Sequence, residues 1–139
     1  MADNGRLQGL LARVGDELQH LRRLSSLTAD ELRSDPDRIP GVKYRFVVAI
    51  EASIDASRLF ALSEGLRAAT SFADSFVILG EAGHLEADLV DRLQNMARFR
   101  NLLVHGYAVV DDARVIEILK SQLDDLDEFR RSLARAIIG

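Results

Sequence analysis

The sequence predicts an all-α fold, an up-and-down bundle of four to five helices that forms a single domain over residues 1–139. Its hydrophobic content of 47% with only two prolines favours a folded core over disorder. Leucine, alanine, arginine and the acidic residues dominate the composition, which favours helices. Apolar residues recur at intervals of three and four, the spacing of one helix face.

The first expected helix has the clearest amphipathic pattern in the chain. Its apolar residues step by four and three along one face: Leu7, Leu11, Val14, Leu18 and Leu21. We expect this helix to continue through Leu24 and Leu27 toward Leu32. Residues 34–41 then contain both prolines and a glycine, so we expect a loop there.

The second and third expected helices follow this loop. Residues 42–62 are rich in alanine and isoleucine and nearly continuous in apolar character, which predicts a helix at the centre of the bundle. A shorter helix is expected from Ser71 to Leu79, stopped by Gly80 and Gly83.

The last two expected helices carry the remaining apolar faces. One runs from about Glu86 to Val104, with a break expected at Gly106. Its buried side holds Leu89, Leu93, Met96, Phe99, Leu102 and Leu103. The other begins near Asp112, which we expect to be its N-cap. Its apolar residues are Ile116, Leu119, Leu123, Leu126, Leu133 and Ile137.

Composition excludes several classes of protein. Without cysteine the chain has no disulfide framework and no thiolate chemistry, which suits a reducing cytoplasm. Charged residues interrupt the N-terminal segment, so we expect no signal peptide, and no run of about 18 apolar residues would span a membrane. His20 and His84 have no partners at metal-ligand spacing, so we expect neither a metal site nor a cofactor.

The segment from Arg92 to Val110 holds three arginines and no carboxylate, in a chain whose net charge is −4. Within it, Arg100, His105 and Tyr107 follow the spacing Arg-x4-His-x-Tyr. Arginine presents a planar fork of donors that matches phosphate, and histidine exchanges a proton near neutral pH. The segment therefore indicates a site for a phosphate-bearing ligand. The negative net charge opposes general attraction to nucleic acid, but two copies meeting here would bring six arginines to one cleft.

Two interpretations of Arg100 and His105 stay open. In the structural one, both bond the last carbonyls of a helix and favour its dipole. In the functional one, they act as a pair, although residues five apart on a continuous helix point about 140° away from each other. The two side chains then converge only if the helix ends before His105 or if a second subunit contributes.

With their flanking pattern, these residues resemble the HEPN superfamily and, within it, the HepT-like ribonuclease toxins. The Arg-x4-His-x-Tyr spacing carries the likeness, and three further segments extend it over roughly residues 43–129. These segments are Tyr44-Arg45-Phe46 leading into Ala49 to Asp55, Asp91 to Arg100, and Leu123 to Phe129.

The resemblance implies a metal-independent endoribonuclease, the toxin of a toxin–antitoxin pair, with its active-site cleft at the interface of a homodimer. It implies that the 2′-hydroxyl of RNA attacks the phosphate while Arg100 stabilises charge and His105 acts as general base or acid. Tyr107 corresponds to the tyrosine that receives AMP from a cognate minimal nucleotidyltransferase antitoxin in some of these pairs. Its phenol can also stack on a base or donate to phosphate, and the alternative is an ordinary half-buried tyrosine.

Four other residues are expected to bind substrate or support the site. Asn101 can donate to phosphate or orient the histidine. Glu51 and Asp55 lie four apart on the second helix, and a buried carboxylate there needs a partner. We expect one of them to orient Arg100 or Arg98. The alternative for each is a polar residue that faces solvent.

A second function stays open, that of a non-cleaving regulatory subunit of a nucleotidyltransferase complex. In that case the arginine, histidine and tyrosine hold nucleotide or receive AMP, and the acidic composition fits this option slightly better. The two functions differ in what His105 must do, because a binder tolerates its loss with weaker affinity whereas a nuclease loses turnover. A purely structural helical dimer would explain the leucine pattern but not the segment without carboxylates.

Overall fold

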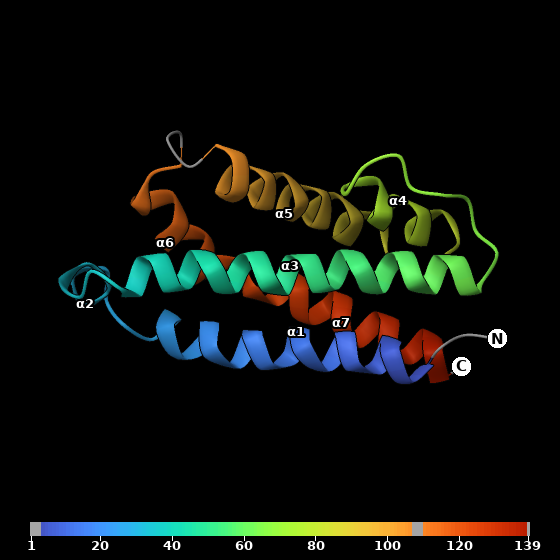
Figure 1. Cartoon of the computed structure of the whole chain (residues 1–139), viewed down its shortest axis with the longest axis horizontal. Helices are drawn as coiled ribbons and strands as arrows, with labels where there is room; N and C mark the ends of the chain where they lie inside the picture. The colour runs from blue at the N-terminus through green and yellow to red at the C-terminus, as the bar shows by residue number, and fades with distance from the viewer. Residues whose placement is uncertain (1–3, 107–109, 139) are drawn as a thin grey trace.

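The computed structural model describes residues 4–106 and 110–138, and every regular element among them is an α-helix. Four helices run lengthwise: α1 (Asn4–Ser25), α3 (Arg38–Ser63), α5 (Ala87–His105) and α7 (Leu123–Ile138). Shorter helices lie toward the ends of this bundle (Figure 1): α2 (Ala29–Ser34), α4 (Asp74–Glu81) and α6 (Asp112–Ser121). The all-α bundle is confirmed, with seven helices in the described residues instead of four to five. None of these helices is long and apolar enough to cross a bilayer.

α3 is the central helix, because it packs against each of the other six. Its buried side contributes Phe46, Ile50 and Ile54 to one contiguous hydrophobic core. The ring of Phe46 meets the ring of Phe99 on α5 edge-on, with centroids 5.3 Å apart. This contact fixes the register of α5 against α3.

The first helix is shorter than expected, because α1 ends at Ser25 and α2 begins after Thr28. The Thr28 hydroxyl accepts from the Glu31 N–H at 3.1 Å, and the Glu31 carboxylate accepts from the Thr28 N–H at 2.9 Å. This reciprocal capping box starts a new helix. The run of leucines concealed that signal, and Leu32 is buried on α2 instead of α1.

The expected loop over residues 34–41 is also too long. α3 already begins at Arg38, and Pro40 and Gly41 lie within it near its start. Proline is tolerated in the first turn of a helix, because its missing N–H would have no partner there. The link between α2 and α3 is therefore only residues 35–37.

α4 starts three residues later than expected and contains Gly80, which the sequence had suggested would end it. A Cβ added at Gly80 would lie 2.7 Å from Cγ2 of Val90 on α5. Gly80 therefore sets how closely α4 approaches α5. The chain turns at Gly83 instead, where φ is +85°, a conformation that glycine adopts without steric cost.

The expected fifth helix is in fact two helices, α6 and α7, which meet at Gln122. The N-cap of α6 is Asp111 and not Asp112, since the Asp111 carboxylate accepts from the Arg114 N–H at 2.8 Å. Neither glycine nor proline marks the break at Gln122, so the sequence carries no plain signal for it. The break lets α6 lie at the α2 end of the bundle while α7 runs lengthwise (Figure 1).

Replacing Gly80 by alanine is expected to destabilise the protein by about 1–3 kcal/mol, because the new methyl group overlaps Val90. The overlap outweighs the gain in helix propensity, which is about 1 kcal/mol or less. Chemical denaturation measures the free energy of unfolding. The control is Gly9→Ala on α1, where nothing lies within 4 Å of the added Cβ and a slight gain in stability is expected. A Gly80→Ala variant as stable as wild type would contradict the close approach of α4 and α5.

Candidate active site

α5 is a continuous helix through His105, and it carries both the arginine and the histidine of the motif. Its C-cap is Gly106, whose N–H donates to the Leu102 carbonyl at 2.8 Å. A helix that ends before His105 is therefore excluded. Arg100 and His105 point about 140° apart and lie about 7.5 Å apart along the helix axis. A single chain does not bring these two side chains together.

Glu51 holds Arg100 against α3. Nη2 of Arg100 donates to Oε2 of Glu51 at 2.6 Å, and Nε donates to the same oxygen at 3.0 Å. The Arg100 side chain is only 12% exposed, whereas that of Glu51 is 42% exposed. A charge that is largely withdrawn from water needs such a partner. Of the two carboxylates expected to orient an arginine, Glu51 is the one that contacts Arg100.

Phe72, in the link between α3 and α4, lies against the same guanidinium. The Arg100 guanidinium carbon is 4.8 Å from the centroid of the Phe72 ring, within the range of a cation–π contact. Arg58 of α3 lies over the same ring at 5.0 Å. Neither Phe72 nor Arg58 was among the residues predicted from the sequence. The one available signal for Phe72 is an aromatic residue in a link of mostly small and polar residues.

Arg100 keeps donors for a ligand. Its Nη1 donates to Oδ1 of Asn101 at 3.1 Å, so with the two bonds to Glu51 three of its five N–H groups are occupied. No other described residue bonds the remaining N–H on each terminal nitrogen. Because Glu51 and Phe72 already orient the guanidinium, it can meet an anion with little reorganisation.

His105 is exposed in the last turn of α5 and makes no hydrogen bond or ion pair with another described residue. Asn101 contacts Arg100 and not the histidine. Tyr107 lies outside the described residues, so its expected role stays a prediction. Within the described ranges, no three histidine or acidic side chains gather in a way that could hold a metal ion.

The segment without carboxylates is less cationic in three dimensions than in the sequence. Arg92 donates to Asp125 on α7 at 2.6 Å and lies 3.4 Å from Glu128. Arg100 is paired with Glu51. These pairs join residues 33 to 49 positions apart, so the sequence window does not reveal them. Arg92 thus faces α7 of its own chain, and the gathering of six arginines in the cleft of two copies stays a prediction.

Neither Asp55 nor Arg98 forms a hydrogen bond or ion pair with Arg100. Asp55 is exposed one turn beyond Glu51 and has no ion pair with any described residue. Arg98 donates to Oδ1 of Asn95 at 2.9 Å and lines a groove between α5 and α6. Because Arg98 lies two residues before Arg100 on the same helix, the two side chains point about 160° apart around the helix axis. The roles expected of Asp55 and Arg98 stay predictions.

Comparison with known proteins identifies a family for this chain. The family model described as ribonuclease HepT-like matches residues 14–133. A curated relative, the mRNA nuclease HepT of Shewanella oneidensis, is 29% identical over 79 residues, which are 57% of this chain and 59% of that protein. The chain therefore spans less than two thirds of the length of this relative.

Solved structures share the fold over nearly the whole chain. A tri-AMPylated HEPN toxin of Shewanella oneidensis in complex with MNT antitoxin has a TM-score of 0.86 at 21% identity, covering 97% of this chain and 99% of that one. YutE, a cytosolic protein of unknown function from Bacillus subtilis, has a TM-score of 0.85 at 17% identity, covering 98% and 91%. At these identities the likeness shows the fold alone. Because the family model covers most of the chain, the chain belongs to the ribonuclease HepT-like family.

Proposed function

We propose that this chain is a metal-independent endoribonuclease that acts as the toxin of a toxin–antitoxin pair. The observation that carries the proposal is the Arg100 guanidinium, oriented by Glu51 and Phe72 with two N–H groups left for a phosphate. The same helix ends in an exposed His105. The relative that is an mRNA nuclease supports RNA as the class of substrate.

A homodimer would supply the histidine that Arg100 does not meet within its own chain. α5 turns Arg100 and His105 to different sides, so the histidine that serves the phosphate at Arg100 comes from the partner copy. In a symmetric dimer this exchange is mutual and generates two identical sites.

One side of α3 suits the face of such a dimer. Residues spaced by four and three form a stripe there: Tyr44, Val48, Glu51 and Asp55. Tyr44 at its start is 65% exposed. A large apolar side chain this exposed favours a partner surface. Glu51 places the Arg100 site within this stripe.

In the proposed reaction the 2′-oxygen bonds to the adjacent phosphorus, and the bond from phosphorus to the 5′-oxygen of the next nucleotide breaks. A base takes the 2′-hydroxyl proton and an acid protonates the departing 5′-oxygen, and His105 serves one of these steps. Arg100 stabilises the charge that builds on the phosphoryl oxygens. The products are a 2′,3′-cyclic phosphate and a 5′-hydroxyl. Because RNA carries its own nucleophile and Arg100 supplies positive charge, no step needs a metal ion.

The proposed antitoxin is a cognate minimal nucleotidyltransferase that transfers AMP to Tyr107. The AMPylated HEPN toxin solved with its MNT antitoxin supports this partner. AMP adds bulk and negative charge, and both would repel a phosphodiester backbone. We also propose that the chain acts in the cytoplasm, which the cytosolic YutE and the absence of cysteine support.

Purified wild-type protein is expected to cleave RNA in EDTA, and His105→Ala is expected to be at least about 10²-fold slower because it lacks the proton-transfer group. Gel analysis of labelled RNA gives the rates, and mass spectrometry identifies the cyclic phosphate. Circular dichroism and size-exclusion chromatography check that the variant is folded and dimeric. If wild type of unmodified intact mass does not cut, the non-cleaving regulatory subunit replaces this proposal. Equal cutting by both proteins would mean that His105 is not catalytic.

Mixing Arg100→Ala with His105→Ala tests the shared site. Each variant alone is expected to be inactive. If the histidine comes from the partner, a mixed dimer contains one complete site, and random exchange restores up to about a quarter of wild-type activity. The mixture is unfolded and refolded together so that subunits exchange, and Arg100→Ala refolded alone is the control. A mixture no more active than the separate variants would place arginine and histidine in the same subunit.

Glu51→Ala is expected to lower kcat about ten- to a hundredfold, because Arg100 loses the contact that orients it. Asp16→Ala is the control: it removes an exposed carboxylate on α1 that makes no ion pair with a described residue, and its kcat is expected to stay at the wild-type value. Steady-state cleavage of one RNA oligonucleotide measures both, with circular dichroism as a check of folding. Faster cleavage by Glu51→Ala would show that the carboxylate mainly repels RNA.

A further inference from the structure

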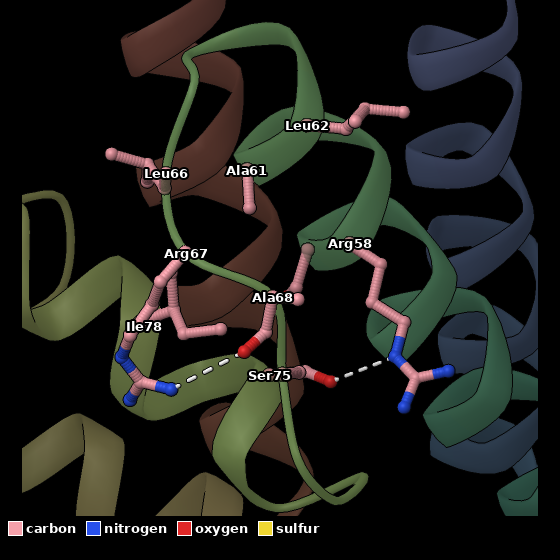
Figure 2. A pocket seen from close by; sticks show the side chains of 10 residues that line it. Arg58, Ala61, Leu62, Leu66, Arg67, Ala68, Ser75 and Ile78 are labelled. Atoms are coloured by element: carbon pink, nitrogen blue, oxygen red, sulfur yellow. Dashed lines mark hydrogen bonds between the residues drawn. The ribbon is translucent and has the colours of Figure 1, made fainter.

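A cavity of about 360 Å³ lies next to the link between α3 and α4 (Figure 2). Its walls are mostly apolar and include Ala61, Leu62, Leu66, Ala69 and Ile78. The proposed cleavage step uses only Arg100 and His105 and leaves this cavity without a role.

Arg58 connects the cavity to the site. Its side chain lines the cavity, and its Nε donates to Oγ of Ser75 at 3.1 Å. Its guanidinium carbon lies 5.0 Å from the Phe72 ring centroid, and that of Arg100 lies 4.8 Å from the same centroid. The two guanidinium groups are therefore separated by no more than the sum of these distances. Both can contact neighbouring phosphates of one strand.

The charge of Arg58 is not neutralised as that of Arg100 is. No carboxylate among the described residues forms an ion pair with Arg58, which is exposed. Figure 2 shows its terminal nitrogens on the side away from Ser75 and from the cavity. A guanidinium anchored through Nε keeps both terminal nitrogens available for two phosphate oxygens.

Arg67 holds the link that forms one wall of the cavity. Its guanidinium makes two bonds to Asp74, of 2.7 and 2.9 Å, and two to Glu81, of 2.9 and 3.1 Å. The same guanidinium holds the pKa of the Asp74 carboxyl well below its usual range and lowers the pKa of Glu81. Both carboxylates thus stay ionised and bonded to Arg67 at neutral pH, and the cavity is formed before a ligand arrives.

We propose that Arg58 and this cavity form an RNA-binding subsite next to the scissile phosphate, an inference that rests on the proposed function. Arg58 binds a neighbouring phosphate, and the base attached to that nucleotide enters the cavity. Single-stranded RNA fits both features, because its phosphate matches the open fork and its unstacked base gains apolar contact.

The first test compares Arg58→Gln with Arg13→Gln, an equal charge change at an exposed position on α1. On a short single-stranded RNA, Arg58→Gln is expected to raise KM about tenfold with little change in kcat. The slope of log affinity against log salt should fall in magnitude by about 0.7, the loss of one phosphate contact. Arg58→Lys keeps the charge without the planar fork of donors, so its KM and salt slope should lie between those of wild type and Arg58→Gln. Arg13→Gln should match wild type in all three quantities.

The second test concerns the base. Ala68 is exposed and lines the cavity, so Ala68→Leu is expected to fill part of it, with Ala12→Leu on α1 as control. Replacing single bases near the cut by abasic sugars should raise the KM of wild type at one position. At that position the KM of Ala68→Leu should be the same for the intact and the abasic RNA.

The outcomes separate the two proposals. If wild type cleaves RNA and Arg58→Gln has the KM and salt slope of wild type, the subsite proposal is wrong and the ribonuclease proposal is unaffected. The subsite proposal is also wrong if removing each base changes the KM of wild type and of Ala68→Leu by the same factor. No cleavage by wild type overturns both the subsite and the ribonuclease.

Discussion

The ion pair between Glu51 and Arg100 ties the candidate site to the bundle. It joins α3 to α5 across 49 residues of sequence, and it satisfies a guanidinium that is only 12% exposed. The edge-on contact of Phe46 with Phe99 also joins α3 to α5, close to the ion pair. This core packing brings the Glu51 carboxylate within reach of Arg100. Phe72 then contacts the guanidinium from the link before α4. The direction in which Arg100 presents its free donors follows from these three contacts.

The continuity of α5 is the second constraint on the site. A helix separates residues five apart by about 140°, and α5 does not end until after His105. The same periodicity that buries Phe99 and Leu103 therefore prevents one chain from completing an arginine–histidine pair. Within one chain, Arg100 and His105 therefore stay on different sides of α5.

Charge is distributed differently in the fold than along the chain. The segment that contains Arg92 and Arg100 has no carboxylate of its own, yet α7 and α3 supply partners for both. Arg58, which the sequence did not single out, is instead the arginine beside the site without an ionic partner among the described residues. Attraction to a phosphate therefore depends on individual donors and not on net charge, which is −4 for the whole chain.

The sequence by itself determined the helical class, most of the buried face of each long helix and the expectation that Glu51 or Asp55 meets an arginine. These follow from periodicity and from the cost of burying charge, and both are local properties that a single chain displays. On α5 the prediction was wrong about Leu102, which was expected to be buried and is 44% exposed. The predicted helix bounds were wrong where local signals compete. At Thr28 a capping box lies inside a leucine pattern, and at Gly80 close packing against Val90, instead of a helix end, explains the glycine. Only the tertiary structure decided that Glu51 is the partner, that Arg92 is neutralised by α7, and that Phe72 and Arg58 join the site. Those contacts link residues 14 to 49 positions apart, and their geometry depends on how helices pack against one another, which no spacing within one helix specifies.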